Sequence, residues 1–95
     1  MVDSAKLNGK KVIGANGYIV GEVEGIEVNE ENWQVEGLQV GLTNEAATDA
    51  GFKRPVLSQI IIVIPPKLIS SVGDVVALNE AIVNLKDLVK YLGFR

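Results

Sequence analysis

Three stretches rich in apolar residues follow one another in the first half of the chain. They cover residues 12–13, 18–28 and 33–42, and in the two longer ones apolar and polar residues largely alternate, as in a half-buried β-strand. Asn16-Gly17 separates the first two stretches. This dipeptide between apolar runs predicts a β-hairpin, because both residues tolerate a positive φ.

Glycines and one phase shift indicate that these strands bend sharply. Gly21 and Gly25 interrupt the alternation of the second stretch. In the third stretch Val35 is out of phase with the apolar residues that follow it, which predicts a β-bulge near Glu36-Gly37. Strands that bend in this way are typical of a small barrel rather than a flat sheet.

The second half of the chain combines short helices with fully apolar strands. Thr43 is the expected N-cap of one or two helical turns that end at Gly51. Strands are expected over residues 59–64 and 75–78, and residues 60–64 and 75–78 are apolar on both faces, as in buried strands. Apolar residues at helical spacing then predict a C-terminal helix over about residues 79–92.

These elements predict one mainly β domain over residues 1–95, a small and strongly bent β-barrel of five to six strands. A short inserted helix interrupts the strands. The barrel core covers about residues 6–79, and the C-terminal helix of about residues 79–92 follows it.

Two of the predicted strands need a cover on their outward faces, because exposed apolar strand faces promote aggregation. Either the C-terminal helix or a second copy of the chain could supply this cover. We favour an oligomer, in the form of a homodimer. The residues of this helix-covered or dimer-forming apolar face are Ile61, Val63, Val76, Ile82, Leu85 and Val89.

Charge is distributed unevenly along the chain. The net charge is −3, but residues 1–50 hold nine acidic and three basic residues, whereas residues 51–95 hold three acidic and six basic residues. Six glutamates and no lysine or arginine lie between Glu22 and Glu36. This segment is either a solvated hairpin face or a docking face for a basic partner. In both cases direct binding to nucleic-acid phosphate is disfavoured.

The residue types needed for several kinds of chemistry are missing. The chain has no cysteine and no histidine, which excludes hydrolytic triads with histidine, thiol chemistry and zinc sites built from these residues. We therefore expect a protein that is not an enzyme, with no catalytic residues, cofactor or metal. No apolar run approaches the length of a membrane span, and we expect a cytoplasmic protein without direct membrane insertion.

Four residues are candidates for partner binding. Trp33 is the one tryptophan, and Phe52, Lys53 and Arg54 place an aromatic ring beside two cations on a connector. Aromatic and arginine side chains are enriched among the residues that dominate binding energy at protein interfaces. The alternative is that Trp33 packs in the core or at its rim and that Phe52 anchors a loop.

Two glycine-containing patterns resemble those of the PRC-barrel domain. The first runs through Leu7, Gly9, Val12, Gly14, Gly17, Gly21 and Gly25, and the second is Val72-Gly73-Asp74-Val75-Val76. The resemblance covers roughly residues 6–79 and implies a PRC-type barrel. That domain occurs in the H subunit of the photosynthetic reaction centre and in the ribosome-maturation factor RimM.

Within that superfamily, residues 40–47 and 51–53 are most similar to stand-alone archaeal proteins of about this length. The resemblance implies a non-enzymatic adaptor in cell division, which works with SepF, the membrane anchor of the FtsZ ring. It also implies a homodimer that associates with paralogues and is recruited from the cytoplasm to the division site. The alternative is a role in ribosome maturation or RNA processing, as for RimM.

Overall fold

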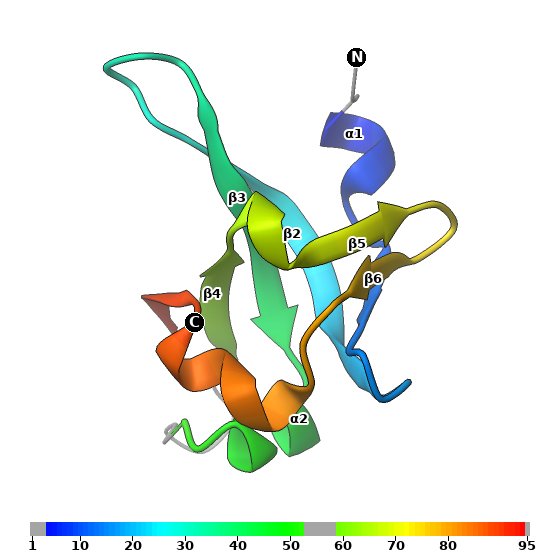
Figure 1. Ribbon diagram of the computed structural model, residues 1–95. Helices are drawn as coiled ribbons and strands as arrows, with labels where there is room; N and C mark the ends of the chain where they lie inside the picture. Colours follow the sequence, from blue (N-terminus) through cyan, green and yellow to red (C-terminus); the bar gives the residue numbers. More distant parts are fainter. Residues whose placement is uncertain (1–3, 53–58, 95) are drawn as a thin grey trace.

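The computed structural model describes residues 4–52 and 59–94, which form one curled seven-stranded sheet with short helical segments (Figure 1). The strands are β1 (Lys11–Ile13), β2 (Ile19–Val28), β3 (Val35–Leu42), β4 (Ile60–Ile64), β5 (Ile69–Val72), β6 (Val76–Leu78) and β7 (Lys90–Phe94). The helical segments are α1 (Ser4–Leu7), α2 (Asn44–Asp49) and the 3-10 helices η1 (Pro66–Leu68) and η2 (Ile82–Asp87).

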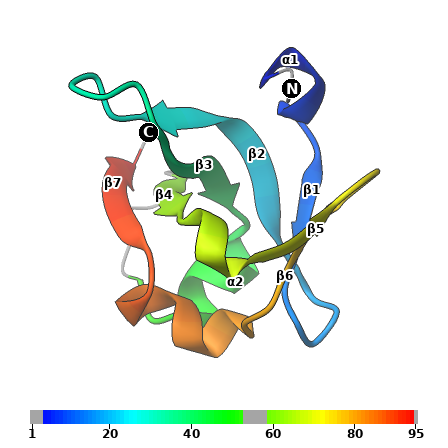
Figure 2. The same ribbon diagram turned by 45° about the horizontal axis from the view of Figure 1, so that its top comes forward.

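The sheet has the strand order β5-β6-β1-β2-β3-β4-β7. All neighbouring strands are antiparallel except β1 and β6, which are parallel. The strands curl around a common interior, and β5 and β7 form the two edges of the sheet (Figure 2). The prediction of a mainly β, strongly bent barrel is confirmed, with seven strands in place of five to six.

The predicted β1–β2 hairpin is present. Gly17 N–H donates to the Gly14 carbonyl at 2.9 Å, and Gly14 N–H donates to the Tyr18 carbonyl at 2.9 Å. Gly17 has a φ of +85°, whereas Asn16 does not take a positive φ. The loop is therefore of the three-residue kind, in which a turn is followed by one residue in the left-handed region.

The expected bulge and the expected bends also occur. Val28 pairs with Val35 and Glu27 pairs with Gly37, so Glu36 is the extra residue of a bulge in β3. A further shift of register lies between Val23 and Gly25, with Glu24 as the extra residue of β2. These irregularities let β2 and β3 bend together around the core.

One glycine allows two strands to approach each other closely. A Cβ atom added at Gly21 would lie 2.1 Å from the carbonyl oxygen of Gly41 on the neighbouring strand. The tight curl of β2 against β3 at this point therefore requires a residue without a side chain.

The interior is wholly apolar among the described residues. The core combines side chains from most of the strands with side chains from α2 and η2. Its largest fully buried members are Leu42, Ile60, Ile62, Ile64, Leu85, Val12, Val20, Val23, Val40 and Val76. Burial of each such side chain contributes about 1.5–3 kcal/mol before the entropy of ordering is subtracted.

The short inserted helix forms as the sequence predicts. Thr43 is the N-cap of α2, and its Oγ1 accepts a hydrogen bond of 3.0 Å from Ala46 N–H. Gly51 follows the helix with a φ of +88°. Ala46 and Ala47 face the core and are buried.

The prediction of a C-terminal helix over about residues 79–92 is wrong: the helical part is shorter, and the rest of the segment forms a strand. The helical segment is the 3-10 helix η2, and the chain then forms β7 along β4, with Ile62 paired to Tyr91. Ile82 and Leu85 are buried, as the helical spacing predicts, but Leu88 and Leu92 are exposed. As a strand, β7 forms backbone hydrogen bonds with the edge of β4, which would otherwise lack a partner. This pairing stabilises the segment more than a continued helix would.

The apolar face expected around these residues is also different from the prediction. Val76, Ile82 and Leu85 belong to the core, and Val63 is buried on the opposite face of β4. Ile61 and Val89 are partly buried. Four of the six residues are therefore buried within the single chain, and the face at which two copies would pair stays a prediction.

Candidate binding groove

The two ends of the curled sheet are built differently. At one end, which we call the closed end, α2 and η2 cover the core (Figure 1). At the other end, which we call the open end, residues 26–38 of the β2–β3 hairpin project beyond the rest of the sheet (Figure 1). We call this projecting segment the arm.

The arm projects because its neighbouring strand stops early. β4 pairs with β3 only between Gly41 and Leu38, and Pro65 and Pro66 follow the last residue of β4. Proline lacks the N–H needed to extend the ladder, so the chain turns into η1 and β5 instead. The outer part of β3 therefore has no β4 partner.

An apolar groove of about 320 Å³ lies between the arm and β5. Its main lining residues come from four elements: Leu7 of α1, Ile26 of β2, Val35 and Leu38 of β3, and Ile69 and Val72 of β5. We call this site the groove. Its lining is apolar throughout, so it offers a surface for apolar side chains and none of the groups that catalysis requires.

Exposure increases from the floor of the groove to its rim. Leu38 is 6% exposed and forms part of the core, whereas Val35 is 53% exposed and Val72 is 52% exposed. Exposed apolar residues that adjoin one another are a common mark of an interaction surface. The groove thus continues the core outward to a rim that has no cover in the single chain.

Trp33 stands at the tip of the arm and is 76% exposed. Its φ of +59° lies in the left-handed region, which is rarely populated by bulky residues, and no other described residue except glycine has a positive φ. Backbone strain of this kind is found preferentially at functional sites. The alternative of core packing for Trp33 is wrong, and its role in binding stays a prediction.

Hydrogen bonds within the loop hold Trp33 in this conformation. Trp33 N–H donates to the Asn29 carbonyl at 2.7 Å, and Asn29 N–H donates to the Gln34 carbonyl at 2.8 Å. The side-chain oxygens of Asn29 and Asn32 accept hydrogen bonds from Glu31 N–H at 2.9 Å and Gln34 N–H at 3.0 Å. These hydrogen bonds fix the backbone of the polar turn after β2 and hold the indole at the tip of the arm.

The other partner-binding candidates lie elsewhere. Phe52 follows α2 at the closed end, is partly buried against the core and stacks on Tyr91 with ring centroids 5.9 Å apart. This position agrees with the alternative that Phe52 anchors its loop. Lys53 and Arg54 lie outside the described residues. The structure therefore does not bring Phe52 and Trp33 together.

The acidic segment runs along the arm. Glu30, Glu31 and Glu36 are exposed there, and no ion pair involves them among the residues that the structure describes. Nearer the barrel, Glu22 pairs with Lys11 at 3.7 Å and Glu27 accepts a hydrogen bond of 2.7 Å from Gln39. The outer part of the arm thus combines apolar side chains with uncompensated negative charge.

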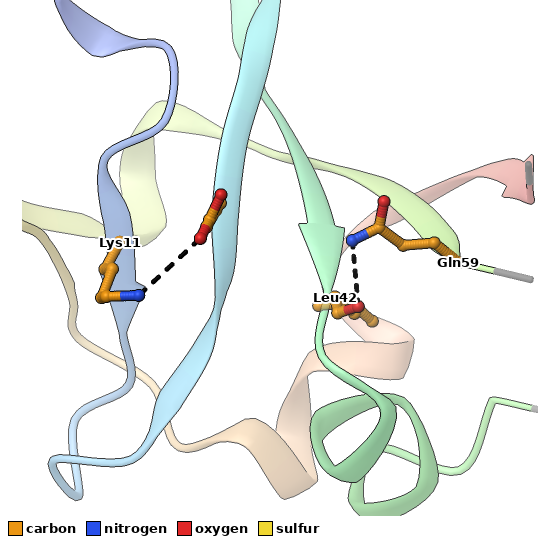
Figure 3. A network of polar contacts seen from close by, with 4 residues as sticks. Lys11, Leu42 and Gln59 are labelled. Carbon is orange, nitrogen blue, oxygen red and sulfur yellow. Dashed lines mark hydrogen bonds and ion pairs between the residues drawn. The ribbon is translucent and has the colours of Figure 1, made fainter.

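Two polar contacts lie on the outer face of the sheet, away from the groove. Figure 3 shows the Lys11–Glu22 pair and the contact from Gln59 Nε2 to the Leu42 carbonyl at 3.5 Å. The Gln59 side chain occupies the space that a side chain at Gly41 would need. These contacts lie on the surface of the sheet, and none of their residues lines the groove.

The sequence pattern does not predict most of the groove. Val35 stands out in it only as a change of phase, and the pattern predicts no strand over Ile69–Val72. A usable signal was Pro65-Pro66, which ends β4 before the β2–β3 hairpin ends. Within residues 4–52 and 59–94 there is no cluster of three or more side chains suited to a metal ion, and no helix is long and apolar enough to cross a membrane.

The sequence was compared with known proteins at two levels, families and individual curated proteins. A comparison with models of protein families matches residues 1–81 to the PRC-barrel domain. A search of curated proteins returns no match.

Proposed function

This chain belongs to the PRC-barrel domain family, and from that premise we propose that it is a non-enzymatic module for binding another protein. The observation that carries the proposal is the apolar groove with Trp33 exposed at the tip of its flanking arm. Covering a water-exposed tryptophan and half-exposed valines with a partner removes apolar surface from water, which lowers the free energy of the complex. Buried tryptophans also dominate many protein interfaces.

We further propose that the partner belongs to the cell-division machinery. The support is the similarity of residues 40–47 and 51–53 to stand-alone archaeal division adaptors. The partner is then a SepF-like protein or a paralogous PRC-barrel protein, and the chain moves from the cytoplasm to the division site by binding it. A homodimer is part of this proposal.

Affinity capture with groove variants tests this function. The wild-type chain is tagged in its source cells and compared with a double variant, Val35→Lys with Val72→Lys, which places two charges at the rim of the groove. Val83→Lys is the control for a lysine placed elsewhere, because Val83 is 65% exposed on η2 at the closed end. We expect a division protein to be captured by the wild type and the control and lost from the double variant.

Two results would contradict the proposal. Capture that is equal for all three chains would place the binding site outside the groove. Capture of ribosomal proteins without any division protein would favour the ribosome-maturation role instead. The homodimer has a separate test, since light scattering at micromolar concentration that gives the 10.2 kDa mass of one chain would exclude it.

A further inference from the structure

β5 has one edge that pairs with no strand among the described residues. It is the terminal strand of the sheet order, and its other edge pairs with β6 from Ile69 to Val72. Two side chains of β5, Ile69 and Val72, line the groove. The groove is therefore bordered by a strand edge with backbone groups that are free to form a ladder with an added strand.

The two edges of the sheet differ in their protection. Proteins commonly protect an edge strand with charged residues, lysine above all. β7 begins at Lys90, whereas β5 reads Ile-Ser-Ser-Val and has neither a charge nor a proline. The edge without a charge is thus the edge that lies beside the groove.

We propose that the groove binds an extended basic and apolar segment of a partner protein, which adds to β5 as a further strand. Alternate side chains of an extended segment point to the same face, so every second residue would enter the groove. This inference rests on the proposed function and specifies the chemistry of the partner.

The charge of the arm selects a basic segment. Glu30, Glu31 and Glu36 are exposed on the same arm as the rim residue Val35, and the whole segment from Glu22 to Glu36 lacks a lysine or arginine. Complementary charge accelerates association and disfavours partners of the wrong sign. An acidic segment would be repelled, and a second copy that offered its own arm would bring two sets of glutamates together.

Peptide selection on the full chain tests the inference. A random library of twelve-residue peptides displayed on phage is selected against the wild type, with the Val35→Lys and Val72→Lys double variant used to remove binders from other surfaces. We expect the selected peptides to carry net positive charge and apolar residues at alternate positions. Selection of acidic peptides, of peptides without this alternation, or of none would overturn the inference.

Backbone methylation then tests strand addition itself. The best peptide is synthesised with N-methyl groups on its odd or on its even residues, because only every second N–H of an added strand faces β5. We expect one set to weaken binding at least about tenfold and the other to change it little, since each lost hydrogen bond contributes modestly. Equal effects of the two sets would exclude an added strand.

Charge variants test the role of the arm. Glu30→Gln, Glu31→Gln and Glu36→Gln together are expected to weaken binding about three- to tenfold at low salt and to flatten its salt dependence. A control with the same change of net charge at the closed end combines Glu45→Gln, Asp49→Asn and Asp87→Asn, and is expected to change binding little. Equal effects of the two triple variants would remove the arm from recognition.

These results separate the inference from the proposed function. If the captured cellular partner is lost from the groove double variant but its binding segment is acidic or helical, the inference fails and the proposed function stands. If the captured partner is retained by that variant, the proposed function fails whatever peptides are selected.

Discussion

Apolar residues are buried at the closed end of the sheet, whereas several are exposed at the open end. At the closed end Ala46, Ala47, Ile82 and Leu85 from α2 and η2 are buried in the core. At the open end the apolar surface continues from Leu38 to Val35 and is left uncovered.

Within one short chain, different residues therefore stabilise the fold and offer a surface for binding. The elements at the closed end complete the core, so changes there act on the free energy of unfolding. Beyond Ile26 and Leu38 the arm lies outside the core and holds exposed apolar side chains, so changes there act on association. Variants at each end can show whether the effects on folding and on association are separate.

The largest expected effect is at the closed end. Leu85→Ala removes a side chain that is fully buried, and we expect it to lower the free energy of unfolding by about 2–5 kcal/mol. Val72→Ala at the rim of the groove is expected to cost less than about 1 kcal/mol. Urea denaturation followed by circular dichroism measures both, and a similar cost at the two positions would contradict the contrast.

A smaller effect at the same end concerns the cap of α2. Thr43→Ala removes the hydroxyl that accepts a hydrogen bond from Ala46 N–H, and we expect a loss of about 1 kcal/mol in the free energy of unfolding. Thr48→Ala is the control, because Thr48 is exposed and its hydroxyl donates only to the Asn44 carbonyl within α2. Equal losses for the two variants in urea denaturation would show that the cap is not the cause.

At the open end we expect a change of the opposite sign. Trp33→Asn replaces a strained residue by one that tolerates the left-handed region, and should raise the free energy of unfolding by up to about 1 kcal/mol. The same variant should lose partner capture, whereas Tyr18→Asn at the β1–β2 turn should retain it. A destabilised Trp33→Asn chain would mean that the indole supports the fold.

The smallest effects concern two lysines, one at each end. Lys86 donates to the Gly51 carbonyl at 3.1 Å and links η2 to the end of α2, while Lys10 donates to the Gly73 carbonyl in the β5–β6 turn. Replacing either by methionine should cost about 0.5 kcal/mol, since both side chains border solvent. Hydrogen exchange should then locate the loosened amides near Gly51 for Lys86→Met and near Gly73 for Lys10→Met.

Local signals in the sequence predict the parts of the fold that depend on neighbouring residues. The β1–β2 hairpin follows from Gly17, the bulge at Glu36 from the change of phase at Val35, and α2 from Thr43 and Gly51. In each case the residues that determine the conformation lie within a few positions of one another. Such features are accessible to reasoning about periodicity and capping.

The features that were missed depend on residues far apart in the chain. The spacing of apolar residues up to Leu92 also suits a helix, and only the pairing of Tyr91 with Ile62 makes this segment a strand. The groove has the same origin, because it exists only where the register of Leu38 with Ile64 leaves the arm without a neighbour. The periodicity of one short apolar segment does not show whether it forms a helix or pairs with a distant strand.

The position of Trp33 also determines what the intrinsic fluorescence of this protein reports. Trp33 is the single tryptophan, and in the folded chain its indole is already largely hydrated. Its emission should therefore resemble that of the unfolded chain and be nearly insensitive to denaturation. Burial of the same ring by a docked partner would shift the emission to shorter wavelength, so the chain contains an optical probe of binding that is silent to folding.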